Sequence, residues 1–132
     1  MFTQSLPGPP DTLPVLASPT DAAAPLTDRA RAWLHTNCAQ CHRPNGPTPT
    51  SLDLRATTAL AATNACDATP QAGDLGLVDA RLIAPGDASR SVLLARSNRR
   101  DANGMPPVGS SAIDSAGVAL LTDWINSLAS CQ

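Results

Sequence analysis

The chain has 132 residues, which is long enough for one domain with a modest core. Its eleven acidic and nine basic residues give a formal net charge of −2 at pH 7. This near balance provides no basic surface for nucleic acid, so we expect no nucleic-acid partner. No apolar run approaches the roughly 20 residues that a membrane-spanning helix needs, and we therefore expect no transmembrane segment.

Residues 1–25 contain six of the thirteen prolines. Proline removes a backbone donor and fixes φ, so we expect an extended linker or an arm rather than a helix. Residues 26–132 then form the folded domain. No basic residue precedes Arg29 and the first ten residues hold no apolar run, so the features of a signal peptide are missing. We interpret Met1 as an expression start, or the chain as part of a longer protein.

A helix is predicted from residue 26 to about residue 42. Thr27 is the expected N-cap, and Asp28 suits the positive end of the helix dipole. Apolar and cysteine side chains recur at spacings of three and four on one face: Ala30, Trp33, Leu34, Cys38 and Cys41. The cysteine pair therefore lies on or just past the last turn, and a loop rich in Pro, Asn and Gly follows.

Two further helices are predicted downstream. Residues 70–87 indicate turns and short extended pieces, and Asp87 or Ser89 is expected to cap a helix over residues 88–98. The final helix has the clearest pattern, with Asp114 as its cap and one apolar stripe: Val118, Leu121, Trp124, Ile125 and Leu128. No segment alternates long enough for a sheet, so the expected fold is all-α, small and loop-rich.

Cys38, Cys41 and His42 form a C-x-x-C-H motif. Three chemistries use such a cluster: a zinc half-site, a dithiol redox pair and covalent haem attachment. Zinc usually takes two Cys/His pairs, and the sequence has no second pair. A redox dithiol usually follows a strand and opens a helix, whereas this pair comes at the end of one. Haem attachment is therefore favoured, with zinc and dithiol chemistry as alternatives.

Haem attachment accounts for each residue of the motif. Two thiols one helical turn apart can add to the two vinyl groups on one porphyrin edge, which places His42 under the ring as the proximal iron ligand. A large flat group would also supply the bulk missing from a chain with only three aromatic residues. We therefore expect one covalent haem c, held by Cys38 and Cys41.

Met105 is the expected iron ligand on the other face of the haem. It is the only internal methionine and lies in a loop, residues 99–111, where Gly104 allows close backbone approach and two prolines stiffen the chain. A methionine that only fills a gap in the core is the alternative. His35 shares a helix with His42, so we expect it at the surface or beside the site rather than on the iron.

With these motifs, residues 26–131 resemble the cytochrome c family: a helix, "CAQCH", loops, "MPP" and a last helix with "LLTDWINSL". The resemblance implies a small cytochrome c fold, in which the first and last helices cross and loop-rich helices wrap around one haem. It carries over Cys38 and Cys41 as attachment points, His42 as proximal ligand and Met105 as distal ligand. "RARAWLHTNCAQCHRPNG" and "DARLIAPGDASRSVLLAR" are similar to the C-terminal cytochrome domains of large bacterial proteins, which are often fused to a dehydrogenase.

Cys66 and Cys131 lie outside the motif. Covalent haem attachment in bacteria is expected outside the cytoplasm, where an oxidising environment would pair these two cysteines. We therefore expect a Cys66–Cys131 disulfide and a periplasmic or extracellular location. Two buried free thiols are the alternative.

Four arginines are candidates to hold the haem propionates by paired hydrogen bonds: Arg55, Arg96, Arg99 and Arg100. Arg55 and Arg96 are the ones retained as contacts, and ordinary surface charge is the alternative for each. The second N–H of His42 is expected to reach a backbone carbonyl in the next loop, at Pro47 or Pro49.

One-electron transfer is the function that these expectations favour. The haem would pass electrons between a fused or docked oxidoreductase and a downstream acceptor, with no catalytic residues in this chain. A haem enzyme of the peroxidase kind and a gas sensor are the alternatives, and both need a labile or open sixth iron position.

Overall fold

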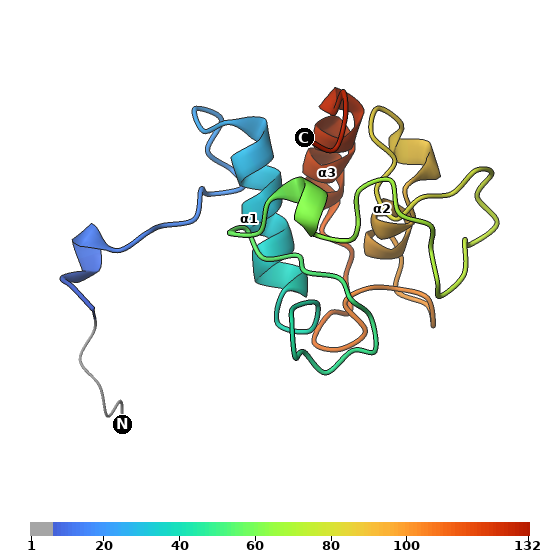
Figure 1. The fold of residues 1–132 in the computed structure, drawn as a ribbon, viewed down its shortest axis with the longest axis horizontal. Helices are drawn as coiled ribbons and strands as arrows, with labels where there is room; N and C mark the ends of the chain where they lie inside the picture. The colour runs from blue at the N-terminus through green and yellow to red at the C-terminus, as the bar shows by residue number, and fades with distance from the viewer. Residues whose placement is uncertain (1–6) are drawn as a thin grey trace.

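The computed structural model describes residues 7–132, and residues 1–6 of the predicted arm lie outside the described part (Figure 1). The α-helices are α1 (Leu26–Cys38), α2 (Val92–Ser97) and α3 (Ser115–Ser127), and three short 3₁₀ turns accompany them: Pro10–Thr12, Leu60–Ala62 and Ala88–Arg90. The beginning of the described N-terminal segment extends away from the body of the molecule in Figure 1, whereas residues 15–17 lie near the start of α1. Arg29 on α1 ties this segment down by donating from Nε to the Pro19 carbonyl oxygen, 2.9 Å away.

The expectation of an all-α fold is wrong. Helix accounts for only 33% of the structure, and most of the chain between α1 and α3 forms loops. Within residues 7–132 the only β-type pairings are two isolated bridges, Cys66 with Ile83 and Arg81 with Ser91. Prolines end helices, and five residues other than glycine adopt positive φ, which favours turns: Asn45, Asn64, Asp67, Leu75 and Asp79.

The helix starts at residue 26 as predicted, but the predicted N-cap, Thr27, is wrong by two residues. Pro25 occupies the N-cap of α1, and no side chain caps this end, so Thr27 lies inside the helix. A proline lacks the N–H that would be unsatisfied here and is therefore well tolerated. The end agrees with the prediction: Cys38 is the last residue of α1 and Cys41 follows just beyond it.

The helix predicted over residues 88–98 is divided in two. Asp87 caps the 3₁₀ turn Ala88–Arg90 by accepting a hydrogen bond from Ser89 N, and Ser91 then has an extended conformation. α2 begins only after this break. At this break the Ser91 hydroxyl accepts a hydrogen bond from Ala84 N at 2.9 Å, which joins the start of α2 to the preceding loop.

The central contact of the fold is the packing of α1 against α3. Asp114 caps α3 as predicted, with Oδ1 accepting from Gly117 N at 2.9 Å. Its other oxygen, Oδ2, accepts from Trp33 Nε1 of α1 at 2.8 Å. The indole donor, followed by the Gly117 N–H, lowers the pKa of Asp114. One carboxylate therefore both starts α3 and joins it to α1.

The core lies between these two helices and the loops that cover them. Its buried apolar side chains come from α1, the 52–88 segment and α3: Ala30, Trp33, Leu34, Leu54, Ala65, Ile83, Ala88, Leu120, Leu121, Trp124 and Ile125. Trp124 is fully buried and is the largest of them. The predicted stripe on α3 is correct for Leu121, Trp124 and Ile125, while Leu120 was missed and Val118 is only half-buried.

A disulfide links the C-terminus to the middle of the chain. Cys66 and Cys131 lie at bonding distance, with 2.19 Å between their sulfur atoms, although 65 positions separate them. Closing a loop of this length contributes roughly 4 kcal/mol to stability in the chain-entropy treatment. None of the helices in residues 7–132 has the length and apolar character needed to span a bilayer.

We predict that Gly117→Ala destabilises the protein. A Cβ at this position would overlap Nε1 and Cε2 of Trp33, so α1 and α3 would have to separate. Overpacking of this kind costs about 1–3 kcal/mol, which urea denaturation measures as a lower free energy of unfolding. The control is Ala119→Ser on the exposed face of α3, and an equal loss in both variants would contradict the role given to Gly117.

Candidate functional site

One cavity brings together the four side chains that are expected to attach the haem and ligate its iron. Cys38, Cys41 and His42 line it from the end of α1, and Met105 lines it from the loop that follows α2. The cavity holds about 1140 Å³ of space free of protein atoms, its open mouth included. Its other walls are largely apolar: Leu52, Leu54, Ala65, Ala68, Leu82, Val92, Leu93, Pro106 and Pro107.

The backbone turns sharply between the two cysteines and the histidine. The carbonyl oxygen of Cys38 accepts from Cys41 N at 3.1 Å and from His42 N at 2.8 Å. Both cysteines are free and half-buried. The loop then passes so close that a Cβ at Gly46 would collide with the Cys41 carbonyl. Glycine is therefore required here for the chain to leave the motif.

The environment of Cys38 keeps its thiol protonated. Burial, followed by the neighbouring Cys41, raises the pKa of Cys38 to about 12. A redox dithiol needs the opposite, a lowered pKa that supplies a thiolate near neutral pH. The surroundings of Cys38 therefore disfavour the dithiol alternative.

The zinc alternative also lacks support from the geometry. Across residues 7–132, no three His, Cys, Asp or Glu side chains lie close enough together to hold a metal ion. A structural zinc ion takes four such ligands. Within the described part of the chain, no further group of metal ligands completes a zinc site with Cys38, Cys41 and His42.

His42 is oriented by a threonine that the sequence analysis missed. Its Nδ1 atom lies 3.1 Å from the Thr50 hydroxyl, so the partner is a side chain and not the carbonyl of Pro47 or Pro49 that we expected. Thr48 extends the contact, with its hydroxyl 3.2 Å from that of Thr50 and 3.3 Å from the Cys41 carbonyl oxygen. The "TPT" after the motif is the sequence signal for this contact, because a threonine hydroxyl can pair with a histidine ring nitrogen.

Burial also sets the charge state of this histidine. Desolvation lowers the pKa of His42, which favours the neutral imidazole at neutral pH. A neutral ring has one nitrogen with a proton and one with a free lone pair. With Thr50 at Nδ1, the Nε2 atom is the one left to bind a metal.

Backbone contacts anchor the loop that carries Met105. Met105 N donates to the Arg96 carbonyl oxygen at the end of α2 at 2.9 Å, and Arg100 Nη1 donates to the Met105 carbonyl oxygen at 3.3 Å. Gly104 is buried, and a Cβ there would lie 2.5 Å from the Arg99 carbonyl oxygen. The expected close approach at Gly104 is therefore made against the protein backbone.

The two preferred arginines occupy different places. Arg96 lines the cavity, where its guanidinium donates to the carbonyl oxygens of Asn103 and Ala72 at 3.1 and 2.7 Å. Arg55 is not among the residues that line it. Its side chain instead makes a paired contact with Asp53, with Nε at 2.9 Å from Oδ1 and Nη2 at 2.7 Å from Oδ2.

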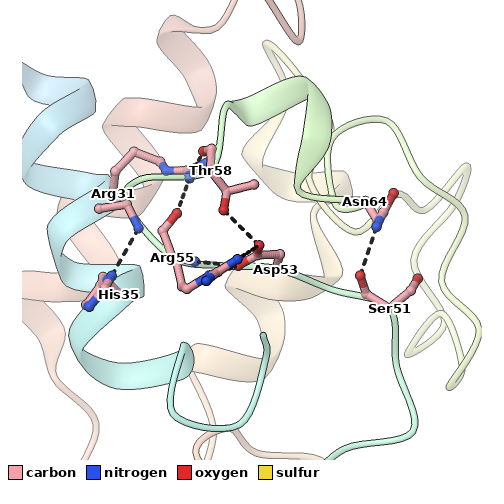
Figure 2. Close-up of polar contacts among 8 residues, drawn as sticks. Arg31, His35, Ser51, Asp53, Arg55, Thr58 and Asn64 are labelled. Atoms are coloured by element: carbon pink, nitrogen blue, oxygen red, sulfur yellow. Dashed lines mark hydrogen bonds and ion pairs between the residues drawn. The ribbon is translucent and has the colours of Figure 1, made fainter. Parts of the chain in front are cut away.

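Asp53 organises the loop behind the cavity, as Figure 2 shows. Besides Arg55, it accepts from the Thr58 hydroxyl at 2.8 Å, and these donors, Arg55 first, hold its pKa well below the usual range. The next residue, Leu54, lines the cavity, and its N–H donates to the His42 carbonyl oxygen at 2.9 Å. The Asp53 contacts therefore hold a wall of the cavity beside His42.

His35 belongs to the same arrangement. Its Nδ1 atom accepts from Ala56 N at 3.1 Å, so this histidine holds the loop against α1 (Figure 2). His35 does not line the cavity. The expectation that it lies near the site without facing the other ligands agrees with this position.

Comparisons with protein-family models, with curated proteins and with solved structures give no match for this chain.

We predict that Asp53→Asn lowers stability at neutral pH and that its effect fades in acid. The folded-state pKa of Asp53 is depressed, so its stabilisation is fully present above the unfolded value of about 3.9 and is lost as pH falls toward the folded value. Urea denaturation at pH 7, 5, 4 and 3 should therefore show the two stabilities converging below about pH 4.

Asp101→Asn serves as the control, because that carboxylate is exposed and lies 3.9 Å from its nearest cation, Arg99. A difference between the Asp53→Asn variant and the parent that stays constant down to pH 3 would show that charge at Asp53 is not responsible.

Proposed function

We propose that this chain binds one covalent haem c and transfers single electrons. The observation that carries the proposal is the shared cavity of Cys38, Cys41, His42 and Met105, whose other walls are largely apolar. Two thiols, an imidazole and a thioether are the donors that attach a haem and ligate its iron on both faces. The residues present therefore fit the group.

When bound, the haem would supply an iron that alternates between the ferric and ferrous states. The residues of the chain have separate tasks around it. Cys38 and Cys41 would fix the ring covalently. The neutral His42 would offer Nε2 to the iron, with its Nδ1–H donating to the Thr50 hydroxyl 3.1 Å away. Met105 offers a weak sulfur ligand that favours the reduced state.

Arg96 is the arginine that remains a candidate for a propionate, because it lines the cavity. It already bridges two loop carbonyls, so a propionate would add to its contacts. Arg55 makes a paired hydrogen bond with Asp53 and does not line the cavity, so we propose only Arg96 of the two as a propionate contact. The amides of Asn64 and Gln71 also line the cavity and are further polar candidates.

The location and partners that we propose follow from the same chemistry. Covalent haem attachment and the Cys66–Cys131 disulfide both suit an oxidising compartment outside the cytoplasm. An oxidoreductase, fused or docked, would donate electrons, and a second redox protein would accept them. The resemblance to cytochrome c family members supports this reading, together with the cavity.

The test is the visible spectrum of protein matured by a haem-attachment system, with and without Met105→Ala. We expect the parent to give a sharp reduced α band and a weak far-red band from sulfur-ligated ferric iron. The variant should lose the far-red band, bind carbon monoxide at least tenfold more tightly, and have a lower midpoint potential, because methionine ligation raises the potential.

Val108→Ala is the matched control, because Val108 is 75% exposed in the same loop. A parent protein that already binds carbon monoxide rapidly would favour a peroxidase-like enzyme or a gas sensor. A Met105→Ala variant with an unchanged spectrum would show that Met105 is not the distal ligand.

We also predict that Thr50→Val raises the midpoint potential of the haem. Loss of the acceptor at His42 Nδ1 makes the imidazole a poorer donor to ferric iron. A tenfold change in this one-electron equilibrium corresponds to about 59 mV, which potentiometry resolves. Thr50→Ser should restore the potential, and Thr57→Val, on an exposed side chain of a nearby loop, should leave it unchanged. Equal potentials for Thr50→Val and Thr50→Ser would contradict the role of the hydroxyl.

A further inference from the structure

A second cavity lies between the N-terminal segment, the start of α1 and the loop of residues 56–60. It holds about 880 Å³ of space free of protein atoms, its mouth included. Val15, Leu16 and Ala17 form one wall, and Ala56, Ala59 and Leu60 form another. The cavity therefore has apolar sides on two segments that are distant in sequence.

Arg31 of α1 is the buried charge of this cavity. It lines the cavity with only 6% of its surface exposed. Its Nη2 atom donates to the carbonyl oxygens of Arg55 and Thr58 at 2.6 and 2.5 Å, while its Nη1 atom is buried without any hydrogen-bond partner. Figure 2 shows the side chain reaching across to this loop. A buried donor left unpaired is costly, and a charged one more so.

The nearest negative charges do not neutralise Arg31. Burial lowers its pKa and the field of Asp53 opposes this only in part, since the Asp53 carboxylate is bound by Arg55 and Thr58. Asp28 also lines the cavity, but it is exposed and no ion pair joins it to Arg31 among the described residues. A cation is thus held in the wall of a cavity without a counter-ion.

The first turn of α1 adds to this positive character. Thr27 and Asp28 bring it to the cavity wall, and no side chain caps this end of the helix. Backbone N–H groups at a helix N-terminus have no partner within the helix and attract anions together with the helix dipole. Two independent features, the helix end and the Arg31 guanidinium, therefore favour negative charge in the same cavity.

We propose that this second cavity binds a small organic carboxylate with a short apolar chain. The carboxylate would take Arg31 Nη1 and the N–H groups at the start of α1, and the chain would lie against Leu16, Ala17 and Leu60. Because Nη1 is buried, a carboxylate reaches it only if part of the cavity wall shifts, and residues 15–17 are the part that we expect to move. Val15 and Leu16 are 86% and 43% exposed, so little packing opposes this shift. The proposal does not depend on haem binding.

The test is calorimetric titration of the full chain with sodium hexanoate, hexanamide and acetate. We expect hexanoate to bind at least tenfold more tightly than hexanamide, which lacks the charge, and than acetate, which lacks the apolar chain. Nuclear magnetic resonance should place the largest amide shifts at residues 15–17 and 26–28. Absence of hexanoate binding at millimolar concentration, or equal binding of hexanamide, would overturn the proposal.

Two substitutions should move the affinity in opposite directions without touching Arg31. Leu16→Asp places a negative charge on the cavity wall and should weaken hexanoate binding at least tenfold, whereas Val78→Asp, on a 79% exposed side chain of another loop, should not. Asp28→Asn removes a repelling charge and should strengthen binding two- to fivefold. If hexanoate binds only to Asp28→Asn, the Asp28 carboxylate already fills the head-group position and the proposal fails.

Arg31→Gln tests the cation directly, with circular dichroism as a check that the chain still folds. Loss of hexanoate binding in a folded variant supports the proposal, and unchanged binding overturns it. If Arg31→Gln does not fold, the Leu16→Asp and Asp28→Asn titrations decide the question alone.

Discussion

The fold depends on one contact, the Trp33 indole seated over Gly117 and bonded to Asp114. Only glycine leaves room for the ring, and the two carboxylate oxygens of Asp114 accept separately from the first turn of α3 and from the indole. This contact fixes the axis of α1 against α3. The last residue of α1 is Cys38, so the position of the motif follows from a contact more than a helical turn away. The same packing excludes water from the core that lies between the two helices.

In this fold, hydrogen bonds made by side chains restrain the loops, as backbone pairing in sheets or longer helices does in other folds. Asp53, Arg31 and His35 hold the 53–58 segment to itself and to α1, and Leu54 passes this constraint to the His42 carbonyl (Figure 2). The disulfide at Cys66 restrains the loop on both sides of it, and residues 65, 68 and 69 of this loop line the cavity. A cavity with rigid walls needs little rearrangement when a cofactor changes its charge. The loops are therefore part of the site and not only connections.

Much of this arrangement could be predicted from local signals. Asp114 has the side chain and position of a cap, and the end of α1 at the motif follows from the Pro, Asn and Gly after it. The all-α expectation failed because most of the chain between α1 and α3 forms loops, and helical spacing over 88–98 does not reveal that Ser91 breaks the helix to bond Ala84. The expectation for Arg55 differs from the structure because a sequence does not show whether an arginine pairs with a protein carboxylate, here Asp53, or with a haem propionate. The role of Thr50 could not be predicted either, because its contact with His42 depends on the path of the loop between them.

The central claim is that Cys38 and Cys41 hold a haem covalently in this cavity. Intact-mass measurement under denaturing conditions tests it most directly, on protein matured with a haem-attachment system. The account predicts a mass increase equal to one haem, located by peptide mapping on the segment from Cys38 to His42 and absent in the double variant Cys38→Ala/Cys41→Ala. An unmodified mass with two free thiols at Cys38 and Cys41 would contradict the account.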